Sequence, residues 1–321
     1  KLSSEITIIA IGGNATHPEE TDGTADEQKR ISEDIARKLV PLIRREKRLI
    51  ITYGNGPVVG KILLRQVLSK EHLEPMPLDI CVAHSQGGIA FLLVQAIENA
   101  LRELEVKRNI ATLMTRVLVS KMDPSFSNPT KPIGVFYTED QAEILSAEYN
   151  WCMKEDAGRG WRYFVPSPVP MKVLEINTIK NLLDEESIVV AGGGGGIPVV
   201  RDTDGNCEGI PAVIDKDHTS ALLGSELGAK TLILLTSIPE VFLHFGTDRE
   251  EKLIKCSRED LIKYNLQGHF AEGSMKPKIE ATIEFLSNGG EQVLITAAET
   301  LEDALDGKRG SWFLASTEAQ V

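Results

Sequence analysis

Short apolar runs recur along this chain and alternate with longer segments of helical periodicity. Runs of this length, bounded by turn residues, are typical of buried strands. They lie at residues 6–11, 49–53, 187–191, 231–236 and 292–296. A stretch rich in β-branched residues lies at 109–120, and a last short strand is expected at 312–315.

Helical spacing fills the intervals between these runs. Residues 27–45 place Ile31, Ile35, Leu39 and Leu42 on one side of a predicted helix. Further helices are predicted at residues 58–69, 86–104, 220–227 and 274–287. Strands that alternate with helices are typical of α/β proteins with a largely parallel sheet, so we predict that fold class.

Residues 123–170 break this alternation. Prolines stand at positions 124, 129, 132, 166, 168 and 170, and one helix, at about 139–148, is expected inside the segment. The segment nevertheless keeps aromatic side chains such as Phe136, Trp151 and Trp161. We therefore interpret it as an inserted lobe of a single domain that spans residues 1–321, and not as an unstructured linker.

The charge of the chain narrows the choice of partners. Of its 321 residues 42% are hydrophobic, the formal net charge is −12 and the pI is about 5.1. No basic stripe is present, so the sequence does not favour a nucleic-acid partner. An anionic substrate must then be bound by locally placed lysines.

The four cysteines, Cys81, Cys152, Cys207 and Cys256, form no CxxC pair. A disulfide framework or a zinc site is not expected, and reduced thiols indicate a cytoplasmic location. No apolar run of membrane-spanning length is recognised in the sequence, so no membrane partner is expected.

Four glycine-rich turns are each expected to follow an apolar strand. They are Gly12-Gly13-Asn14, Gly54-Asn55-Gly56, Gly192 to Gly196 and the looser Gly268 to Gly273. Glycine allows the backbone to approach a ligand closely, and ligands of open α/β sheets bind at the carboxyl ends of the strands. One such turn can serve only to reverse the chain, but several together favour a shared anion site.

Two common nucleotide motifs are absent. The first turn does not continue as G-x-G-x-x-G. The segment from Gly268 to Gly273 has the glycine spacing of a P-loop, but Ser274 stands where the lysine should be. Phosphate charge must therefore be neutralised by lysines elsewhere in the chain.

Three lysines have unusual neighbours. Lys131 precedes Pro132 in the predicted lobe, Lys216 stands between Asp215 and Asp217, and Lys278 follows Pro277. Phosphoryl transfer needs positive charge held against the phosphoryl oxygens. Any one of these lysines would more often be a solvated surface charge. Asp217 is expected to orient Lys216 and to N-cap the following helix.

Runs of residues over nearly the whole chain, from about 6 to 315, resemble carbamate kinases, a branch of the amino acid kinase superfamily. They are Ile11-Gly12-Gly13-Asn14-Ala15, Gly54-Asn55-Gly56-Pro57, Ser85-Gln86-Gly87, Asn128 to Gly134, Glu155 to Arg162, Val165-Pro166-Ser167-Pro168, Gly193 to Pro198, Val213 to Asp217, Gly273-Ser274-Met275 and Pro277-Lys278. The Asn-Pro-Thr-Lys-Pro and Glu-Asp-Ala-Gly-Arg-Gly-Trp-Arg runs are specific to the carbamate kinase branch.

The resemblance implies a three-layer α/β/α sandwich with an eight-stranded, mainly parallel sheet and a protruding subdomain at residues 123–170. It implies a homodimer that transfers a phosphoryl group between carbamoyl phosphate and MgADP, giving ATP and carbamate, which decays to ammonia and carbon dioxide. Residues 1–122 and 171–190 would mainly bind the carbamate and phosphoryl groups, and residues 191–321 the nucleotide. Transfer would be direct and in line, without a phospho-enzyme, since no histidine has a convincing nucleophile context.

The resemblance also assigns site residues. The catalytic group would be Lys131, Lys216, Lys278 and Asp217. The carbamoyl or phosphoryl group would be bound by Gly12, Gly13, Asn14, Gly54, Asn55, Gly56, Ser85 and Gln86. The nucleotide would be bound by Gly194, Gly195, Asp215, Thr236, Ser237, Phe242, Ala271, Ser274 and Met275, and no metal ligand is assigned.

The sequence departs from the family pattern at a few positions. Tyr53 and His84 fall near the expected substrate side, and an apolar residue is usual where His218 stands. Departures on the expected nucleotide side are Ser237, Glu272 and Lys276. Two alternatives stay open: a kinase for another small acid such as acetylglutamate or glutamate, and a non-catalytic nucleotide-binding paralogue. The retained lysines argue against the second.

Overall fold

The centre of the molecule is one eight-stranded sheet in a computed structural model that describes residues 3–16, 23–156, 158–271 and 275–316. Its strands are β1 (Ser3–Ile11), β2 (Glu46–Tyr53), β3 (Ile110–Thr112), β9 (Ile188–Val190), β12 (Thr231–Thr236), β15 (Lys255–Ser257), β16 (Gln292–Ala297) and β17 (Ser311–Leu314). They lie in the order β15-β17-β16-β12-β1-β2-β9-β3. Neighbouring strands run parallel except at the β16–β17 step, so the predicted mainly parallel sheet is confirmed.

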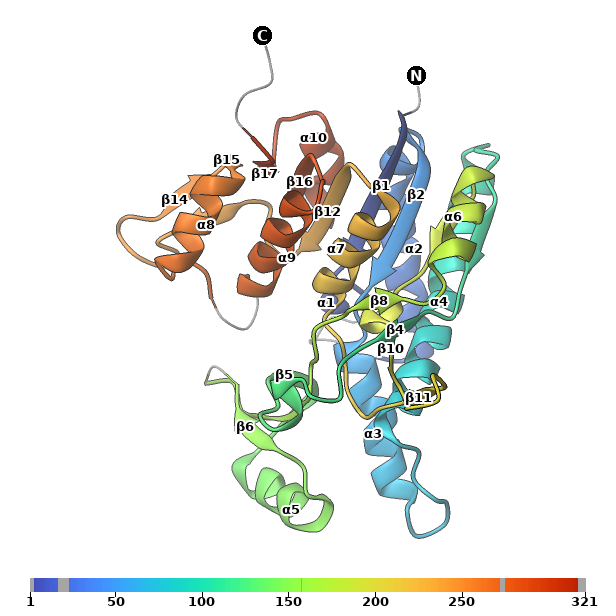
Figure 1. Ribbon diagram of the computed structural model, residues 1–321, viewed down its shortest axis with the longest axis vertical. Coiled ribbons are helices and arrows are strands. Elements are labelled where there is room, and N and C mark those ends of the chain that lie inside the picture. The colour runs from blue at the N-terminus through green and yellow to red at the C-terminus, as the bar shows by residue number, and fades with distance from the viewer. Residues whose placement is uncertain (1–2, 17–22, 157, 272–274, 317–321) are drawn as a thin grey trace.

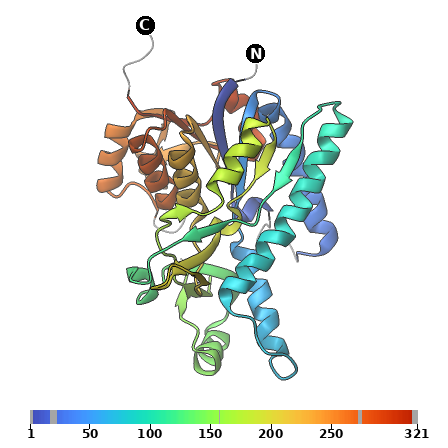
Figure 2. The ribbon, with the colours of Figure 1, turned by 45° about the vertical axis from the view of Figure 1, so that its right-hand side comes forward.

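Helices cover both faces of this sheet and complete the three layers (Figure 1). One layer contains α2 (Ala25–Ile43), α4 (Leu78–Glu103) and α10 (Leu301–Leu305). The other contains α6 (Ile176–Asp184), α7 (Lys216–Leu227), α8 (Arg258–Leu266) and α9 (Lys276–Ser287). Figure 2 shows α4 running along its own side of the sheet. The predicted α/β/α fold is thereby confirmed.

The apolar run of β1 shows why two layers of helices are needed. Ile8 and Ala10 belong to the core under α7 and α9, whereas Ile9 and Ile11 belong to the core under α2 and α4. Side chains alternate between the two faces of a strand, so a continuously apolar strand must be buried on both sides.

The segment predicted as a lobe forms a small sheet of its own beside α5 (Glu139–Tyr149). Its strands are β5 (Lys131–Tyr137), β6 (Met153–Glu155) and β7 (Trp161–Val165), in the order β5-β7-β6. The Trp151 ring stacks on the Tyr163 ring with their centroids 4.3 Å apart. In Figure 1 this lobe projects away from the central sheet on the side of α3 (Gly56–Ser69).

The lobe is attached to α3 by close backbone packing. Ile133 and Val165 are fully buried in one cluster with Val59 of α3. A Cβ atom added at Gly60 of α3 would lie 2.0 Å from the Cα atom of Gly134 in β5. Only glycine at position 60 permits this approach, so the lobe and α3 form one tightly fitted joint.

Several elements differ from the sequence predictions. The stretch 109–120 is divided between β3 and β4 (Arg116–Leu118), and β4 joins a second sheet with β8 (Lys172–Val173), β10 (Ile197–Arg201) and β11 (Cys207–Gly209). Helix α4 begins at Leu78 and not at residue 86, because Pro77 sets its start. The hairpin of β13 (Val241–Leu243) and β14 (Glu251–Leu253) was not anticipated.

Helix α4 is long and apolar enough, by length and composition alone, to cross a membrane. The sequence expectation of no such run was therefore too strict. Half of its most apolar window is buried inside the protein, and Val82, Leu93 and Ile97 pack into the cores. A core helix of a folded domain has these properties, so the feature is accounted for by packing against the sheet and α2.

Candidate active site

Three of the predicted glycine turns lie side by side. They follow β1, β2 and β9, which are consecutive neighbours in the central sheet, at the carboxyl ends of these strands. The prediction for the fourth glycine turn was wrong in part, because Gly268 follows helix α8 and not a strand. Gly273 lies outside the described residues. The three remaining turns form the floor of the candidate site, as expected for an open α/β sheet.

The first two glycine turns are in contact with Lys216. A Cβ atom at Gly54 would lie 2.8 Å from the amide nitrogen of Gly13 and 3.3 Å from Cδ of Lys216. The backbone of one turn therefore approaches the other too closely for any side chain at position 54. The stem of Lys216 packs over this contact, which brings its ammonium group to the glycine floor.

The third glycine turn packs behind the second. A Cβ atom at Gly194 (φ +64°) would lie 2.4 Å from the Asn55 amide nitrogen, and one at Gly195 would lie 2.2 Å from the carbonyl oxygen of Ile214. Both glycines are buried. The structure thus places Gly194 and Gly195, predicted as nucleotide-binding residues, against Asn55 and the approach to α7.

Asn55 and Ser85 are bonded to one another beneath the floor. The Asn55 amide donates to Ser85 Oγ over 2.8 Å, and this hydroxyl donates to the Val82 carbonyl over 2.6 Å. Both side chains are almost completely buried. Asn55 consequently provides no side-chain cap for α3, although it is the N-cap residue. The Asn14 side chain lies outside the part of the chain that the structure describes.

Gln86 holds the third turn through a network that the sequence did not reveal. Its amide nitrogen donates to the Gly193 carbonyl (3.0 Å), and its amide oxygen accepts from the Thr115 N–H (2.8 Å). The Tyr53 hydroxyl donates to the backbone carbonyl of Gln86 (2.6 Å), and burial raises the pKa of Tyr53. By contrast, His84 on the same helix is exposed. The Gln86 side chain is therefore committed to supporting the loop.

Lys216 and Lys278 share one carboxylate. Lys216 Nζ lies 2.5 Å from Oδ1 of Asp217, and Lys278 Nζ lies 3.1 Å from Oδ2 of the same residue. The Lys216 side chain is 9% exposed, that of Asp217 3% and that of Lys278 13%. Two ammonium groups from α7 and α9 thus meet at one nearly buried point beside the glycine floor.

Lys131 reaches the same region from the lobe. Its Nζ donates to Oδ2 of Asp215 over 2.7 Å. The other carboxylate oxygen of Asp215 accepts the backbone N–H of Asp217 over 2.8 Å, so Asp215 is the N-cap of α7. The expectation that Asp217 caps this helix was wrong, because α7 already begins at Lys216 and the cap must precede it.

The electrostatics of the cluster follow from burial opposed by charge pairing. Burial alone would raise the pKa of Asp217, but the ammonium groups of Lys216 and Lys278 outweigh it and lower that pKa. Burial lowers the pKa of Lys216. For Lys278 the attraction of Asp217 and Asp215 outweighs burial and raises the pKa.

Several of the residues predicted for the nucleotide follow β12, lie in β13 or precede α9. Thr236 ends β12, Ser237 follows it in an exposed turn, and the Phe242 ring lies 6.0 Å from that of Phe245. Ala271 is exposed, Met275 directly precedes α9, and Ser274 lies outside the described residues.

Two histidines that the sequence did not single out join these segments. The His244 ring, after β13, meets the His269 ring edge-on with centroids 4.4 Å apart, and Tyr264 of α8 contacts His269 from another side. The spacing of residues in the sequence does not predict this contact, because it forms between two loops. It connects the β13–β14 hairpin to the segment before α9.

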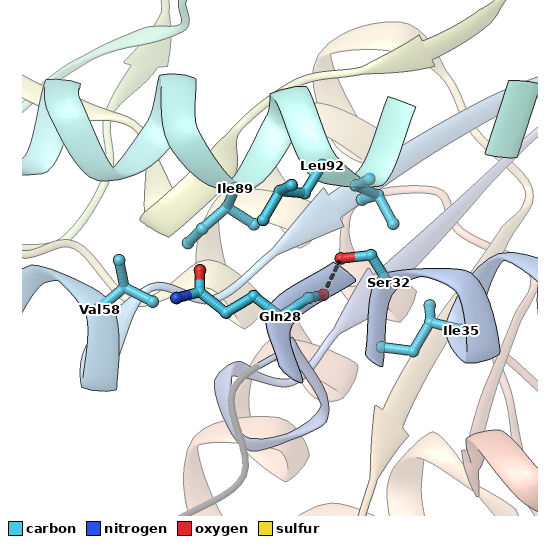
Figure 3. Close-up of a pocket in the computed structure, with 7 residues that line it drawn as sticks. Gln28, Ser32, Ile35, Val58, Ile89 and Leu92 are labelled. Atoms are coloured by element: carbon cyan, nitrogen blue, oxygen red, sulfur yellow. Dashed lines mark hydrogen bonds between the residues drawn. The ribbon is translucent and has the colours of Figure 1, made fainter. Parts of the chain in front are cut away.

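The candidate site is distinct from two hollows lined by other residues. A cavity of about 10 Å³ between α2, α3 and α4, shown in Figure 3, is lined by Gln28, Ser32, Val58 and Ile89 among others, which is room for about one water molecule. A hollow of about 560 Å³ near Arg108 and Glu186 lies at the amino ends of the strands. Within the described residues, no group of three or more His, Cys, Asp or Glu side chains could hold a metal ion.

Comparisons with known proteins agree with this geometry. The model of the amino acid kinase family matches residues 5–297. The chain is 42% identical to a carbamate kinase of Pyrococcus horikoshii, over 96% of this chain and 98% of that protein, and 43% identical to carbamate kinase 2 of Staphylococcus aureus over the same shares. A carbamate kinase from Giardia lamblia bound to AMP-PNP superposes with a TM-score of 0.88 at 37% identity, covering 97% of this chain and 99% of that one.

The chain therefore belongs to the amino acid kinase family. The match extends over nearly the whole length of the carbamate kinases and includes the lobe. Its activity is that of a carbamate kinase, the phosphoryl transfer between carbamoyl phosphate and ADP that the sequence predicted.

Proposed function

We propose that the phosphoryl group is transferred directly and in line above Gly13 and Gly54, between the ammonium groups of Lys216 and Lys278. The observation that carries the proposal is the shared carboxylate: Asp217 holds both ammonium groups within 3.1 Å of its oxygens. Such positively charged groups, fixed before the reaction, stabilise the charge on a transferring phosphoryl group. Asp217 orients both lysines and keeps them charged.

The acid side of the site is formed by the glycine floor. Gly12, Gly13, Asn14, Gly54 and Gly56 bring the backbone to the carbamoyl or phosphoryl group, and the N-terminus of α3, which has no side-chain cap, favours an anion. Asn55 and Ser85 support this floor through the hydrogen bond between them, and Gln86 supports it through its bonds to Gly193 and Thr115. We accordingly narrow the role of Gln86 from substrate contact to positioning of the Gly193 loop.

Lys131 and Asp215 act together at the boundary with the lobe. In the structure Asp215 holds Lys131 and caps α7 at the same time. We infer that carbamoyl phosphate attracts Lys131 toward its phosphoryl oxygens, since an anion competes with Asp215 for the ammonium group. Asp215 is then a positioning residue and not a nucleotide contact. The lobe, residues 123–170, supplies this one charge.

The nucleotide is placed on the other side of the lysine pair, in the part of the chain from residue 191 to 321. Thr236, Ser237, Phe242, Ala271, Ser274 and Met275 would surround the base, whereas Gly194 and Gly195 pack against Asn55 and Ile214 and support the floor. Mg²⁺ arrives as MgADP: both oxygens of Asp217 are paired with lysines, and those of Asp215 with Lys131 and a backbone amide. Magnesium bound mainly through substrate phosphates fits this donor set.

The decisive experiment mixes the purified protein with carbamoyl phosphate and MgADP and measures ATP by a coupled assay. ATP formation that is abolished by chelation and restored by Mg²⁺ is expected. The same assay in reverse, with carbamate, acetylglutamate and glutamate as acceptors, tests the other small acids. Faster turnover of either amino acid derivative would contradict the substrate assignment, and ADP binding without any turnover would indicate a non-catalytic paralogue.

We further infer a cytoplasmic homodimer. All four cysteines lie in the described residues and are free thiols, which fits a reducing compartment. Large apolar side chains are exposed at Phe91, Met122 and Val169, and burying them against a second copy of the chain would remove apolar surface from water. Light scattering of the purified protein should give twice the mass of the 35.2 kDa chain; a monomer at micromolar concentration would contradict it.

A further inference from the structure

Helices α7 and α9 are joined by a second polar contact next to the lysine pair. His218 Nδ1 lies 3.1 Å from Oε2 of Glu284, with the His218 side chain 26% and the Glu284 side chain 32% exposed. His218 immediately follows Asp217 on α7, and Glu284 lies on the helix that begins beside Lys278. Adjacent residues of α7 therefore each bind a different point of α9.

Two separate contacts fix the orientation of α9 relative to α7 more completely than one contact does. The Asp217–Lys278 contact alone would allow α9 to pivot about Asp217. A second contact at His218 prevents this rotation and also limits sliding of one helix along the other. Further along, Gly224 of α7 packs against the ring of Phe285, where an added Cβ would lie 2.4 Å from Cε2. The two helices are thus held at a charged end and at an apolar end.

The electrostatic surroundings of His218 favour its imidazolium form. Burial would lower the pKa of His218, but the hydrogen bond to Glu284 and the charges of Asp215, Glu284 and Asp217 outweigh burial and raise it. These carboxylates come from α7 itself and from α9, while the nearby ammonium groups of Lys216 and Lys278 are paired with Asp217. Protonated His218 makes a charge-assisted bond to Glu284, which is stronger than a bond from the neutral ring.

We propose that His218 is a positioning residue of the phosphoryl-transfer reaction: its pair with Glu284 fixes α9 against α7 so that Lys278 and Lys216 stay on the two oxygens of Asp217. The inference rests on the proposed function, because it requires Lys278 to act on the phosphoryl group. His218 does not touch the reacting atoms. It acts through Lys278, whose placement decides how much charge reaches the transition state.

The pair gives turnover a pH dependence of defined sign. The folded pKa of His218 is raised above its ordinary 6.5, so the ring is mostly charged at pH 6.5 and loses its proton as pH rises through the folded pKa. Loss of the proton weakens the bond to Glu284. We expect the kcat of the unaltered enzyme to decrease as the pH rises through the folded pKa of His218.

The test measures kcat and KM from pH 6 to 9 for three single variants and one double variant with the same substrates. His218→Gln should lower kcat by about 10-fold at pH 6.5, in line with a small displacement of one catalytic group. It should also remove the alkaline limb of the profile, which is the decrease of kcat with rising pH. His218→Lys keeps a positive charge at every pH, so its kcat should remain high and also lose the limb. Glu284→Gln should resemble His218→Gln, and the double variant should be no slower than either single variant.

A matched control is His72→Gln, which alters an exposed histidine after α3 and should leave kcat and the limb unchanged. A His218→Gln enzyme with the kcat and pH profile of the unaltered enzyme would overturn the proposal, even if its melting temperature fell. Failure of the proposed function has a different signature. If Lys278→Ala retains normal turnover, the role of the lysine pair is wrong whatever His218 does.

Discussion

At the scale of single residues, the site depends on a buried carboxylate that holds two buried ammonium groups. Removing one member of a buried set of paired charges leaves an uncompensated charge in a medium of low polarity. This strongly destabilises the folded protein. Asp217 therefore keeps Lys216 and Lys278 charged in a place where burial opposes charge. An arriving phosphoryl group meets positive charge that is already oriented, and little reorganisation is needed during the reaction.

Lys216→Ala or Lys278→Ala should each reduce turnover by at least about 100-fold, because one fixed charge at the transition state is lost. The measurement is kcat in the ATP-forming assay, with circular dichroism to establish that the variants stay folded. Lys180→Ala, which removes an exposed lysine of α6, serves as the control and should be neutral. Near-normal turnover of either site variant would contradict the role assigned to the lysine that it replaces.

Asp217→Asn should shift the pH range of activity. Burial already lowers the pKa of Lys216, and Asp217 is the partner that opposes this effect. Without the carboxylate the pKa of Lys216 falls further, so the charged form is lost at lower pH. Turnover of the variant should decline with rising pH well before that of the unaltered enzyme. Profiles of kcat that coincide at high pH would show that Asp217 does not hold the charge.

At the scale of elements, catalytic geometry depends on how α9 packs against α7. The two lysines come from different helices, so no single helix can fix the distance between them. Gly224 allows α7 to approach the buried ring of Phe285, and Asp215 provides the cap that begins α7 at Lys216. The packing of two helices thereby controls the separation of two charges.

Gly224→Ala should lower both stability and turnover. Alanine would gain up to about 1 kcal/mol of helix propensity, whereas overpacking a dense core costs about 1 to 3 kcal/mol. The added Cβ would lie 2.4 Å from Phe285 Cε2, so the clash should prevail and move the helices apart. Urea unfolding and kcat test this expectation. Combining the change with Phe285→Leu should restore part of both, and additive losses would contradict the steric explanation.

At the scale of the whole molecule, the site is assembled from the main domain and the lobe. Lys131 lies in the first position of β5, and the same strand contacts α3 through Gly134. The joint between Gly60 and Gly134 therefore determines where Lys131 is presented. The lobe is held close to the carboxyl ends of the central strands, which is where the other two lysines lie.

Gly60→Ala tests this joint. In a helix the substitution alone would stabilise by up to about 1 kcal/mol, but the new Cβ would lie 2.0 Å from a backbone atom of the lobe, which must move. Since a displacement of about 1 Å can cost about 100-fold, kcat/KM for carbamoyl phosphate should fall at least 10-fold. Leu68→Ala, at an exposed position of α3, is the control and should be neutral. An unchanged kcat/KM in Gly60→Ala would show that the joint between Gly60 and Gly134 does not affect catalysis.

The sequence predicted local features well and long-range contacts poorly. The strands of the central sheet other than β15, which was not predicted, and the glycine turns after β1, β2 and β9 follow from local apolar runs and breakers. The prediction failed where a short strand depends on its partner, as in β4, β10 and the β13–β14 hairpin. The cap of α7 was assigned to Asp217 and not Asp215, because the helix start could not be placed to one residue.

The order of residues alone determined the class of fold, the chemistry available and, through its motifs, the family. Periodicity, breakers and three lysines beside proline or aspartate are local properties, and each can be recognised without a partner. Only the tertiary structure decided that Lys216 and Lys278 share Asp217, that Gln86 supports a loop, and that His218 meets Glu284. These contacts join residues far apart in the chain, and their geometry follows from how the helices and the lobe pack on the sheet.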